Sequence, residues 1–365
     1  MKIPKILVTP LNWGLGHATR CIPIIKSLEE NGAEVFIASD GVALDLLKKE
    51  FPKNIVFEIP SYDIHYKGNN FGWTMLRQSS KILAAIAKEY KAVKKIVEEH
   101  QIDAIISDNR FGCYYKGIPS VFMTHQLNMI APTKILEKPA NKVNHILIDN
   151  FQKVWVPDLQ GDNSLAGRLS QEHDLDVTYL GVLSRMKNFK VEKKYDVAVV
   201  LSGPEPKRSE FELEIFRQAL QLDDKRFIVV RGQPERWEYY FMKPHLEVVS
   251  FMTSQMLNET MLSADMIIAR SGYSTVMDLW KLQKPALLVP TPGQTEQEYL
   301  AEELSKKNLF LTQSQEDLNI EKALTEINSY QGFLNENILE PFGKIRTTSD
   351  LDQSIKDFLK TLEQT

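Results

Sequence analysis

The turn at residues 12–20 combines glycines with a histidine whose position suits proton transfer. It reads Asn-Trp-Gly-Leu-Gly-His-Ala-Thr-Arg and joins a predicted strand at residues 6–9 to a predicted helix at 18–30. Gly14 and Gly16 permit a tight turn and close approach of a ligand to the backbone. A histidine at a helix start, here His17, can act as a general base because the helix N-terminus disfavours its protonated form. A capping histidine that transfers no proton is the alternative interpretation.

A second turn, Arg270-Ser271-Gly272, has the composition of a phosphate-binding turn. It follows a short apolar run that predicts a buried strand, and it opens a helix. The buried side of that helix is marked by residues at helical spacing, Val276, Leu279 and Trp280. Such a turn directs backbone N–H groups and a positive helix end toward a phosphate. Asp278, one turn into the helix and on another side, is placed to accept hydrogen bonds from ribose hydroxyls.

Strands and helices alternate along the chain in two series, which predicts two α/β domains with parallel sheets. The predicted strands of the first series lie at residues 6–9, 35–38, 55–59, 104–107, 121–124 and 154–156, with a long helix at about 75–99. The second series starts near Val177, with strands at residues 197–201, 227–230, 248–249, 266–269, 286–289 and 309–311. A polar connector at 158–176 separates them. We therefore predict Rossmann-like domains at residues 1–165 and 177–345, and an amphipathic helix at 350–362.

The segment at residues 264–300 resembles the C-terminal half of the GT-B glycosyltransferases. The greatest likeness is to family 28, which includes the N-acetylglucosaminyltransferase that forms lipid II. The shared pattern is R-S-G, T-V, an acidic residue, P-x-L-x-V-P and a Gln-rich loop, which stand here as Arg270-Ser271-Gly272, Thr275-Val276, Asp278, Pro285 to Pro290 and Gln294 to Glu298. Two positions depart from the family: its usual glutamate is Asp278, and its Gln-Gln pair is Gln297-Glu298.

The turn at residues 12–20 is similar to the Gly-His turn of the small-molecule GT-B glycosyltransferases. In those enzymes the histidine takes the proton of the acceptor hydroxyl, and an aspartate after a later strand orients it. The matching position here is Asp108. The resemblance implies a GT-B fold, two Rossmann-like doubly wound domains facing across a cleft, with a C-terminal helix at about 348–365 packing back on the first domain.

The resemblance also implies an activity and a set of site residues. The activity is inverting, metal-independent transfer of a hexose-type sugar from a nucleotide-diphosphate sugar, expected to be UDP-linked, to an acceptor hydroxyl. His17 and Asp108 are the predicted catalytic pair, and Asn12 and His125 the predicted acceptor contacts, although His125 could instead be a turn residue. The predicted donor-binding residues are Gly14, Gly16, Ser202, Gly203, Arg231, Phe251, Met252, Arg270, Ser271, Gly272, Thr275, Asp278, Gln297 and Glu298.

Three other functions compete with this interpretation. Gly14 and Gly16, with Asp40 after the second predicted strand, could form a nicotinamide-dinucleotide site. A nucleotide-sugar epimerase can share the fold and needs no acceptor. A non-catalytic nucleotide-sugar-binding subunit would need a partner chain.

Composition indicates a globular protein of the cytoplasm. The chain has 365 residues, a formal net charge of -4 and two cysteines, which gives no reason to expect nucleic-acid binding or a disulfide framework. We expect no cofactor and no metal, and a monomer or weak dimer. A peripheral contact with the inner face of the membrane and a lipid-linked or cell-envelope acceptor are suggested by lysines on one helical face, Lys81, Lys88, Lys91 and Lys95. A solvated lysine face is the simpler explanation.

Overall fold

A computed structural model describes residues 2–62, 79–131, 133–171, 175–233, 237–327 and 349–363. The chain divides into two compact units, one of Met1–Ser184 with Ile345–Thr365 and one of Arg185–Lys344. We call them the first and second unit. The start of the long helix predicted at about residues 75–99 lies outside the described residues.

The first unit is built on a seven-stranded parallel sheet. Its strands are β1 (Lys5–Pro10), β2 (Glu34–Ser39), β3 (Ile55–Glu58), β4 (Ala104–Asp108), β5 (Ser120–Met123), β6 (Lys153–Val156) and β7 (Val177–Tyr179). Their order is β3-β2-β1-β4-β5-β6-β7, and every pair is parallel. This is the order of a dinucleotide-fold sheet, in which ligands bind beyond the carboxyl ends of the strands. The turn after β1 and the end of β4 therefore share one edge.

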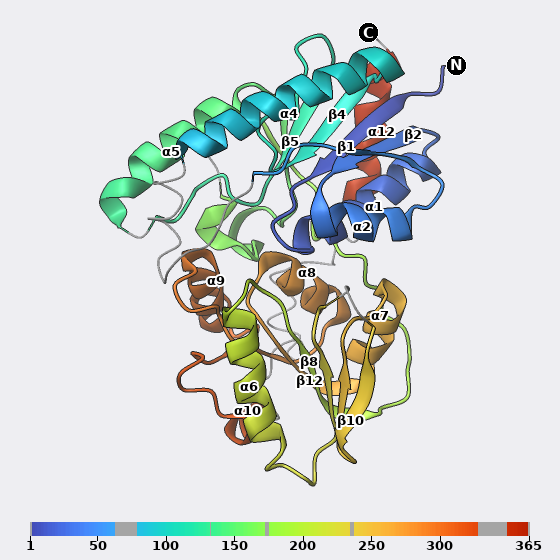
Figure 1. Cartoon of the computed structure of the whole chain (residues 1–365). Helices are drawn as coiled ribbons and strands as arrows, with labels where there is room; N and C mark the ends of the chain where they lie inside the picture. The colour runs from blue at the N-terminus through green and yellow to red at the C-terminus, as the bar shows by residue number, and fades with distance from the viewer. Residues whose placement is uncertain are drawn as a thin grey trace. The chain divides into compact units, whose positions relative to one another are not determined.

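Helices cover both faces of this sheet (Figure 1). They are α1 (Gly16–Glu30), α2 (Gly41–Glu50), α4 (Ser79–His100), α5 (Lys134–Ile148) and α12 (Ser349–Glu363). Val93, Ile96 and Val97 of α4 pack with Leu7 and Ile105 in one buried cluster. On the other side, α12 contacts α1: Asn31 donates to Asp352 at 2.8 Å, and Phe358 packs edge-on against Trp155. The C-terminal helix thus belongs to the first unit.

The second unit has another seven-stranded sheet. Its strands are β8 (Tyr195–Val200), β9 (Phe227–Val230), β10 (Tyr239–Lys243), β11 (Leu246–Val249), β12 (Ala264–Ala269), β13 (Ala286–Leu288) and β14 (Leu311–Thr312), in the order β10-β11-β9-β8-β12-β13-β14. All pairs are parallel except β10 with β11. The helices are α6 (Lys207–Ala219), α7 (Ser254–Leu262), α8 (Tyr273–Leu282), α9 (Thr295–Lys306) and α10 (Ile320–Ile327). Side chains of α6 and α10 pack on β8, β9 and β12 in one large core.

The fold class and most elements agree with the sequence predictions, and three local predictions were wrong. Val177 does not start the second series, because β7 pairs with β6 in the first sheet. The edge strand β10 was missed; its consecutive residues Tyr239, Tyr240 and Phe241 are all exposed, so it lacks the buried run that marked the other strands. The Gln-rich loop is only partly a loop, because α9 already begins at Thr295 and contains Gln297 and Glu298.

Candidate functional site

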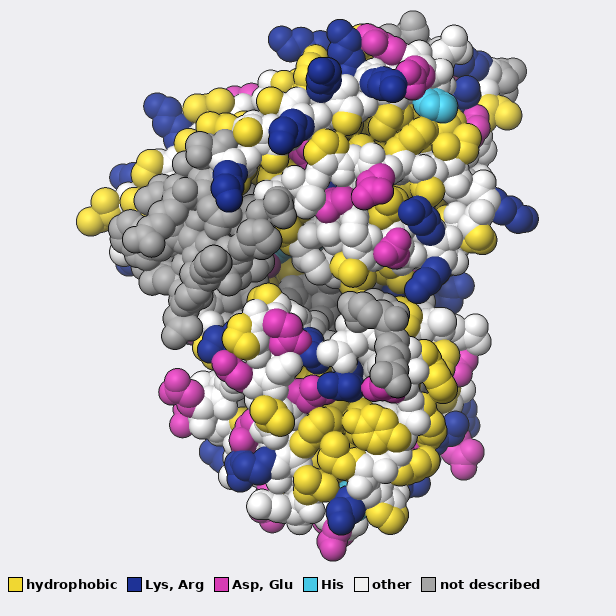
Figure 2. All heavy atoms as spheres, in the orientation of Figure 1, with side chains coloured by type: hydrophobic (Ala, Val, Ile, Leu, Met, Phe, Trp, Pro, Cys, Tyr) yellow, Lys and Arg dark blue, Asp and Glu magenta, His cyan; other side chains and the backbone are white. Residues whose placement is uncertain are grey.

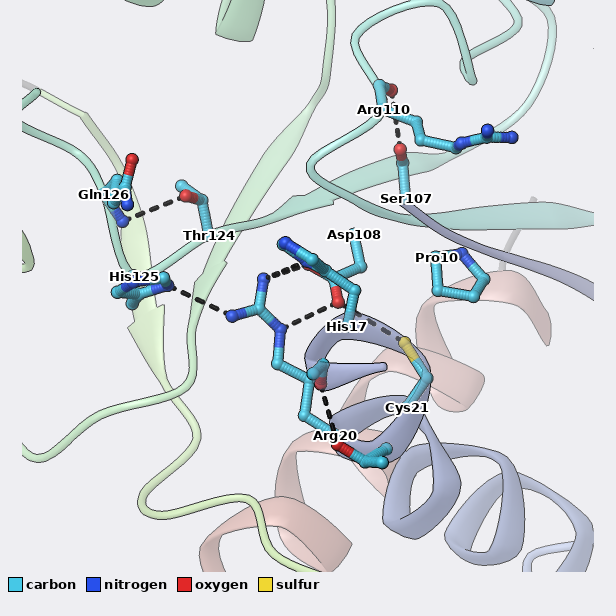
Figure 3. Close-up of polar contacts among 12 residues, drawn as sticks. Pro10, His17, Arg20, Cys21, Ser107, Asp108, Arg110, Thr124, His125 and Gln126 are labelled. Atoms are coloured by element: carbon cyan, nitrogen blue, oxygen red, sulfur yellow. Dashed lines mark hydrogen bonds and ion pairs between the residues drawn. The ribbon is translucent and has the colours of Figure 1, made fainter. Parts of the chain in front are cut away.

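The predicted pair of His17 and Asp108 is in contact. Gly14 has a positive φ of 75°, which turns the chain sharply after β1, and α1 begins at Gly16. His17 therefore lies in the first turn of α1, and Asp108 is the last residue of β4, the strand next to β1. Nδ1 of His17 lies 3.2 Å from Oδ1 of Asp108 (Figure 3). The arrangement is that of a base and the carboxylate that orients it.

Arg20, which the sequence analysis did not select, joins these two residues to His125. Its Nε donates to Oδ2 of Asp108 at 2.7 Å, and its Nη2 donates to Oδ1 of the same carboxylate. Its Nη1 donates to Nδ1 of His125 at 3.1 Å, and Nη2 lies 2.9 Å from Nδ1 of His17 (Figure 3). The sequence did contain a signal for Arg20. It is a charged residue on the buried side of an amphipathic helix, three positions after His17.

The charges of this cluster and its burial shift the pKa values of Asp108 and His17. Burial alone would raise the pKa of Asp108, but Arg20 and His17 overcome it and hold that pKa well below its usual range. Burial lowers the pKa of His17 below its usual 6.5; Asp108 opposes this effect, and Arg20 reinforces it. Asp108 is therefore ionised and His17 neutral near neutral pH. A neutral imidazole beside a carboxylate can accept a proton from a hydroxyl group.

The two predicted acceptor residues are engaged with neighbouring protein groups. Asn12 donates to Asp40 at 3.0 Å and accepts from the backbone N–H of Ala43 at 3.2 Å, so its amide ties the turn after β1 to the turn after β2. His125, only 4% exposed, is held by Arg20. Asp40 also accepts a hydrogen bond from the guanidinium of Arg110, so both of its carboxylate oxygens are bonded within the protein. This pairing does not favour the ribose contact that the dinucleotide interpretation requires.

A second ionic cluster holds the loop that follows Asp108. Arg110 pairs with Asp40 and with Glu89 of α4, where Nε and Oε1 are 3.3 Å apart. Glu89 also accepts from the hydroxyl of Tyr62 at 2.8 Å and from the backbone N–H of Gly112 at 3.1 Å. Both Arg110 and Glu89 are fully buried. The loop after β4 is thus anchored to α4 and to Asp40, the N-cap of α2.

In the second unit, the predicted phosphate turn lies at a helix N-terminus. Gly272 is the N-cap of α8, and no side chain caps that helix end. Ser271 is fully buried and donates to the backbone carbonyl of Gln297 at 2.7 Å, while the side chain of Gln297 accepts from the N–H of Thr291 at 2.9 Å. The starts of α8 and α9 are therefore joined. A helix end of this kind suits a negatively charged group.

The other predicted donor residues of the second unit lie in turns after its strands or on the helices α8 and α9. Ser202 and Gly203 follow β8, are exposed, and Gly203 has a φ of 105°. A Cβ at Gly203 would stand 3.7 Å from Oγ1 of Thr291, so the turns after β8 and β13 are close. Thr275 and Asp278 are partly exposed on α8, and Phe251 and Met252 follow β11. Glu298 is exposed and accepts from the N–H of Gly293 at 2.8 Å within its own turn.

The two arginines predicted to face phosphates have other partners. Arg270 is fully buried, stacks 4.0 Å from the ring centroid of Phe211, and donates to the carbonyls of Val289, Pro290 and Lys207. Arg270 is therefore a structural support for the turns that carry these carbonyls, and its role as a donor-binding residue stays a prediction. Arg231 pairs with Glu212, with Nη2 and Oε2 3.0 Å apart, so a carboxylate already balances its charge.

The residues that the structure describes contain neither a candidate metal cluster nor a candidate membrane span. Within those residues, no group of three or more His, Cys, Asp or Glu side chains could hold a metal ion. No helix among them combines the length and the apolar character needed to cross a bilayer.

Known protein families match both units. Residues 5–138 match the model "Glycosyl transferase family 1", and residues 214–354 match the "Glycosyltransferase family 28 C-terminal domain". The chain is a GT-B glycosyltransferase related to family 28. An uncharacterized glycosyltransferase of Methanosarcina mazei is 23% identical over 321 residues, which cover 80% of this chain and 81% of that protein.

Two further relatives of this glycosyltransferase extend the comparison. The UDP-N-acetylglucosamine–N-acetylmuramyl-(pentapeptide) pyrophosphoryl-undecaprenol N-acetylglucosamine transferase of Nitratiruptor sp. is 24% identical over 304 residues, 81% of this chain and 80% of that one. Among solved structures, the glycotransferase of kitacinnamycin superposes with a TM-score of 0.67 at 14% identity, covering 99% of this chain and 100% of that one. At this identity the structural likeness shows the fold alone.

Proposed function

We propose that this glycosyltransferase moves a hexose-type sugar from a UDP-sugar to an acceptor hydroxyl, with inversion and without a metal ion. The observation that carries the proposal is the contact of His17 with Asp108 at the ligand-binding edge of the first sheet. A base held by a carboxylate is what the activation of a hydroxyl nucleophile requires. The relative from Nitratiruptor, whose name states a UDP-sugar donor, supports the choice of UDP.

In the proposed reaction, Nδ1–H of His17 donates to Asp108, and Nε2 accepts the proton of the acceptor hydroxyl. The acceptor oxygen then bonds to the anomeric carbon, while the bond from that carbon to the diphosphate oxygen breaks. Attack from the face opposite the leaving group inverts the anomeric centre. The diphosphate leaves with its charge stabilised by the uncapped N-terminus of α8 at Gly272. Asp278, one turn further on, is the proposed ribose ligand.

Substitution of His17 tests the base, and calorimetry tests the donor. His17→Ala is expected to retain UDP binding in a calorimetric titration and to lose transfer, measured with labelled UDP-sugars and a lipid extract as the acceptor source. General bases typically contribute about 10² to 10⁴-fold in rate. Turnover by His17→Ala at the wild-type rate would remove His17 from this role. Acceptor-independent release of free sugar or nucleotide would instead indicate an epimerase, and NAD binding without UDP binding would indicate a dinucleotide enzyme.

For the acceptor, we propose a lipid-linked hydroxyl reached from an anionic membrane surface. The four lysines predicted on one face of α4 are all exposed. The neighbouring helix α5 exposes three apolar residues, Ile135 (85%), Val143 (55%) and Ile146 (56%), and three exposed lysines lie beside them, Lys134, Lys138 and Lys142. Figure 2 shows Lys and Arg side chains interspersed with hydrophobic ones over this part of the first unit. Apolar side chains flanked by lysines suit the interface of an anionic bilayer.

Sedimentation with vesicles tests this surface. We expect binding to vesicles that contain anionic lipid and little binding to neutral ones, with a strong dependence on salt because the attraction is electrostatic. Replacing Lys134, Lys138 and Lys142 together by glutamate should abolish the binding while the protein stays folded, since all three are exposed. Equal binding of the triple variant and the wild type would exclude α5 as the contact.

A further inference from the structure

Arg20 contacts three residues of the candidate catalytic site. Its side chain is 2% exposed, and it comes from α1, whereas Asp108 ends β4 and His125 follows β5. The guanidinium donates to both oxygens of Asp108 and to Nδ1 of His125. This use of a planar fork of donors is specific to arginine, because a lysine ammonium is a point charge and cannot reproduce it. Arg20 therefore fixes the orientation of the Asp108 carboxylate.

The same guanidinium also contacts Nδ1 of His17, the ring nitrogen that faces Asp108. Nδ1 of His17 is 3.2 Å from Oδ1 of Asp108 and 2.9 Å from Nη2 of Arg20. Nδ1 either carries a proton to donate to the carboxylate or offers a lone pair to the guanidinium, but it cannot do both. Only the first state leaves the lone pair of Nε2 available for a proton from the acceptor. The balance between Arg20 and Asp108 at this one atom thus controls the proton of His17.

We propose that Arg20 is a positioning residue of the transfer reaction, which holds Asp108 beside His17 and opposes the binding of a second proton by that histidine. The proposal rests on the transfer function proposed above. It requires no contact of Arg20 with a substrate. Its consequence is that His17 stays neutral, and so available as a base, at a lower pH than Asp108 alone would allow.

Among the described residues, four charged or titratable side chains lie around His17 and its Asp108 contact. Arg20 and Cys21 come from α1, Asp108 from β4 and His125 from the end of β5; the thiol of Cys21 points to Asp108 at 3.6 Å. Of these, burial and Arg20 lower the pKa of His17, His125 lowers it less, and Asp108 raises it. Asp108 raises the pKa of His17, and Arg20 opposes this. When Arg20 is removed, the titration of His17 therefore moves to higher pH.

The test is the titration of His17 by nitrogen NMR in Arg20→Gln, without substrates, beside the pH profile of kcat/KM. We expect both the His17 titration and the acid limb of the profile to move up by about one pH unit or more, the usual effect of a charge at this distance. The nitrogen shifts also report which ring nitrogen carries the proton. A titration that stays at the wild-type pH, or moves down, in a folded Arg20→Gln protein would overturn the proposal.

Arg20→Lys provides the second variant, because Arg20→Gln leaves a buried carboxylate without its partner and can fail to fold. The lysine keeps the charge but cannot hold both oxygens of Asp108 and His125 at once. We expect a kcat at least about tenfold lower, an unchanged KM for the donor and a His17 titration displaced upward. Wild-type kcat and titration in Arg20→Lys would show that the fork is not needed and would contradict the proposal.

Arg110→Lys is the matched control. Arg110 is also a buried arginine of the first unit, but it pairs with Asp40 and Glu89 and not with His17. We expect it to lower stability without moving the His17 titration, and an equal movement in both lysine variants would refute a specific role of Arg20. If no transfer activity is found, a shifted His17 titration still supports the action of Arg20 on His17, whereas the proposed function alone fails.

Discussion

The buried carboxylate Glu89 is expected to make the stability of the first unit fall as the pH rises. Its side chain is fully buried in α4, and this burial raises its pKa from the usual 4.5 to about 7. Arg110, the Tyr62 hydroxyl and the N–H of Gly112 act in the opposite direction and compensate only in part. Because burial outweighs these partners, Glu89 keeps its proton well above the pH at which the unfolded chain releases it.

The sign follows from where the proton is bound. Between pH 4.5 and about 7 the folded state holds a proton on Glu89 that the unfolded state has released, so rising pH favours unfolding. The contribution is fully present below pH 4.5 and is lost as the pH passes through about 7. The whole effect corresponds to about 3 kcal/mol. Most of it falls between pH 5 and pH 8.

Glu89→Gln isolates this contribution, because glutamine has the shape of the protonated acid at every pH. Relative to the wild type, the variant should gain about 2–3 kcal/mol of stability between pH 5 and pH 8. Urea unfolding followed by hydrogen-exchange mass spectrometry on peptides of β1 and β4 reports the first unit by itself. The control is Glu99→Gln on the same helix, where the exposed glutamate pairs with Lys95 at 3.7 Å.

A wild-type protein whose stability does not decline relative to Glu89→Gln over this pH range would refute the reasoning. The comparison removes the influence of other groups, including Asp108, because both proteins share them. A decline that appears equally in Glu99→Gln and Glu89→Gln would place its origin elsewhere in the unit.

Three further substitutions test the donor site and the packing of the loop after β4. Asp278→Ala is expected to weaken UDP binding about tenfold or more in titration calorimetry, since a hydrogen bond to a charged group contributes about 1.5–3 kcal/mol; unchanged affinity would remove Asp278 from the ribose. Gly112→Ala should lower the stability of the first unit by about 1–3 kcal/mol in thermal unfolding, because its Cβ would stand 2.3 Å from the carbonyl oxygen of Ile86; an unchanged melting temperature would show that the loop can shift. Arg270→Met should reduce the affinities for UDP and for uridine by the same factor, because Arg270 is buried under the turns and donates to their backbone carbonyls. A loss confined to UDP would return Arg270 to the diphosphate.

Most of the fold could be predicted from the sequence, because the signals are local. Apolar runs of four to six residues between turn signals located the parallel strands β1, β2, β4, β9 and β12. Strand β10 escaped because an exposed edge strand lacks a buried run, and β7 was placed in the wrong domain because sheet membership depends on a partner strand. The turns that carry His17 and Gly272 were found, since glycine and helix-start patterns mark them directly.

The sequence by itself determined which residues end the strands and begin the helices, and hence that His17 and Asp108 share one edge of the sheet. Only the tertiary structure decided the pairing of charges: Arg20 with Asp108, 88 positions apart, and Arg110 with Asp40, 70 positions apart. It also decided that Arg270 stacks on the ring of Phe211. The physical reason is that a buried arginine must find acceptors wherever the packed chain offers them, and their positions follow from strand order rather than from spacing in the sequence.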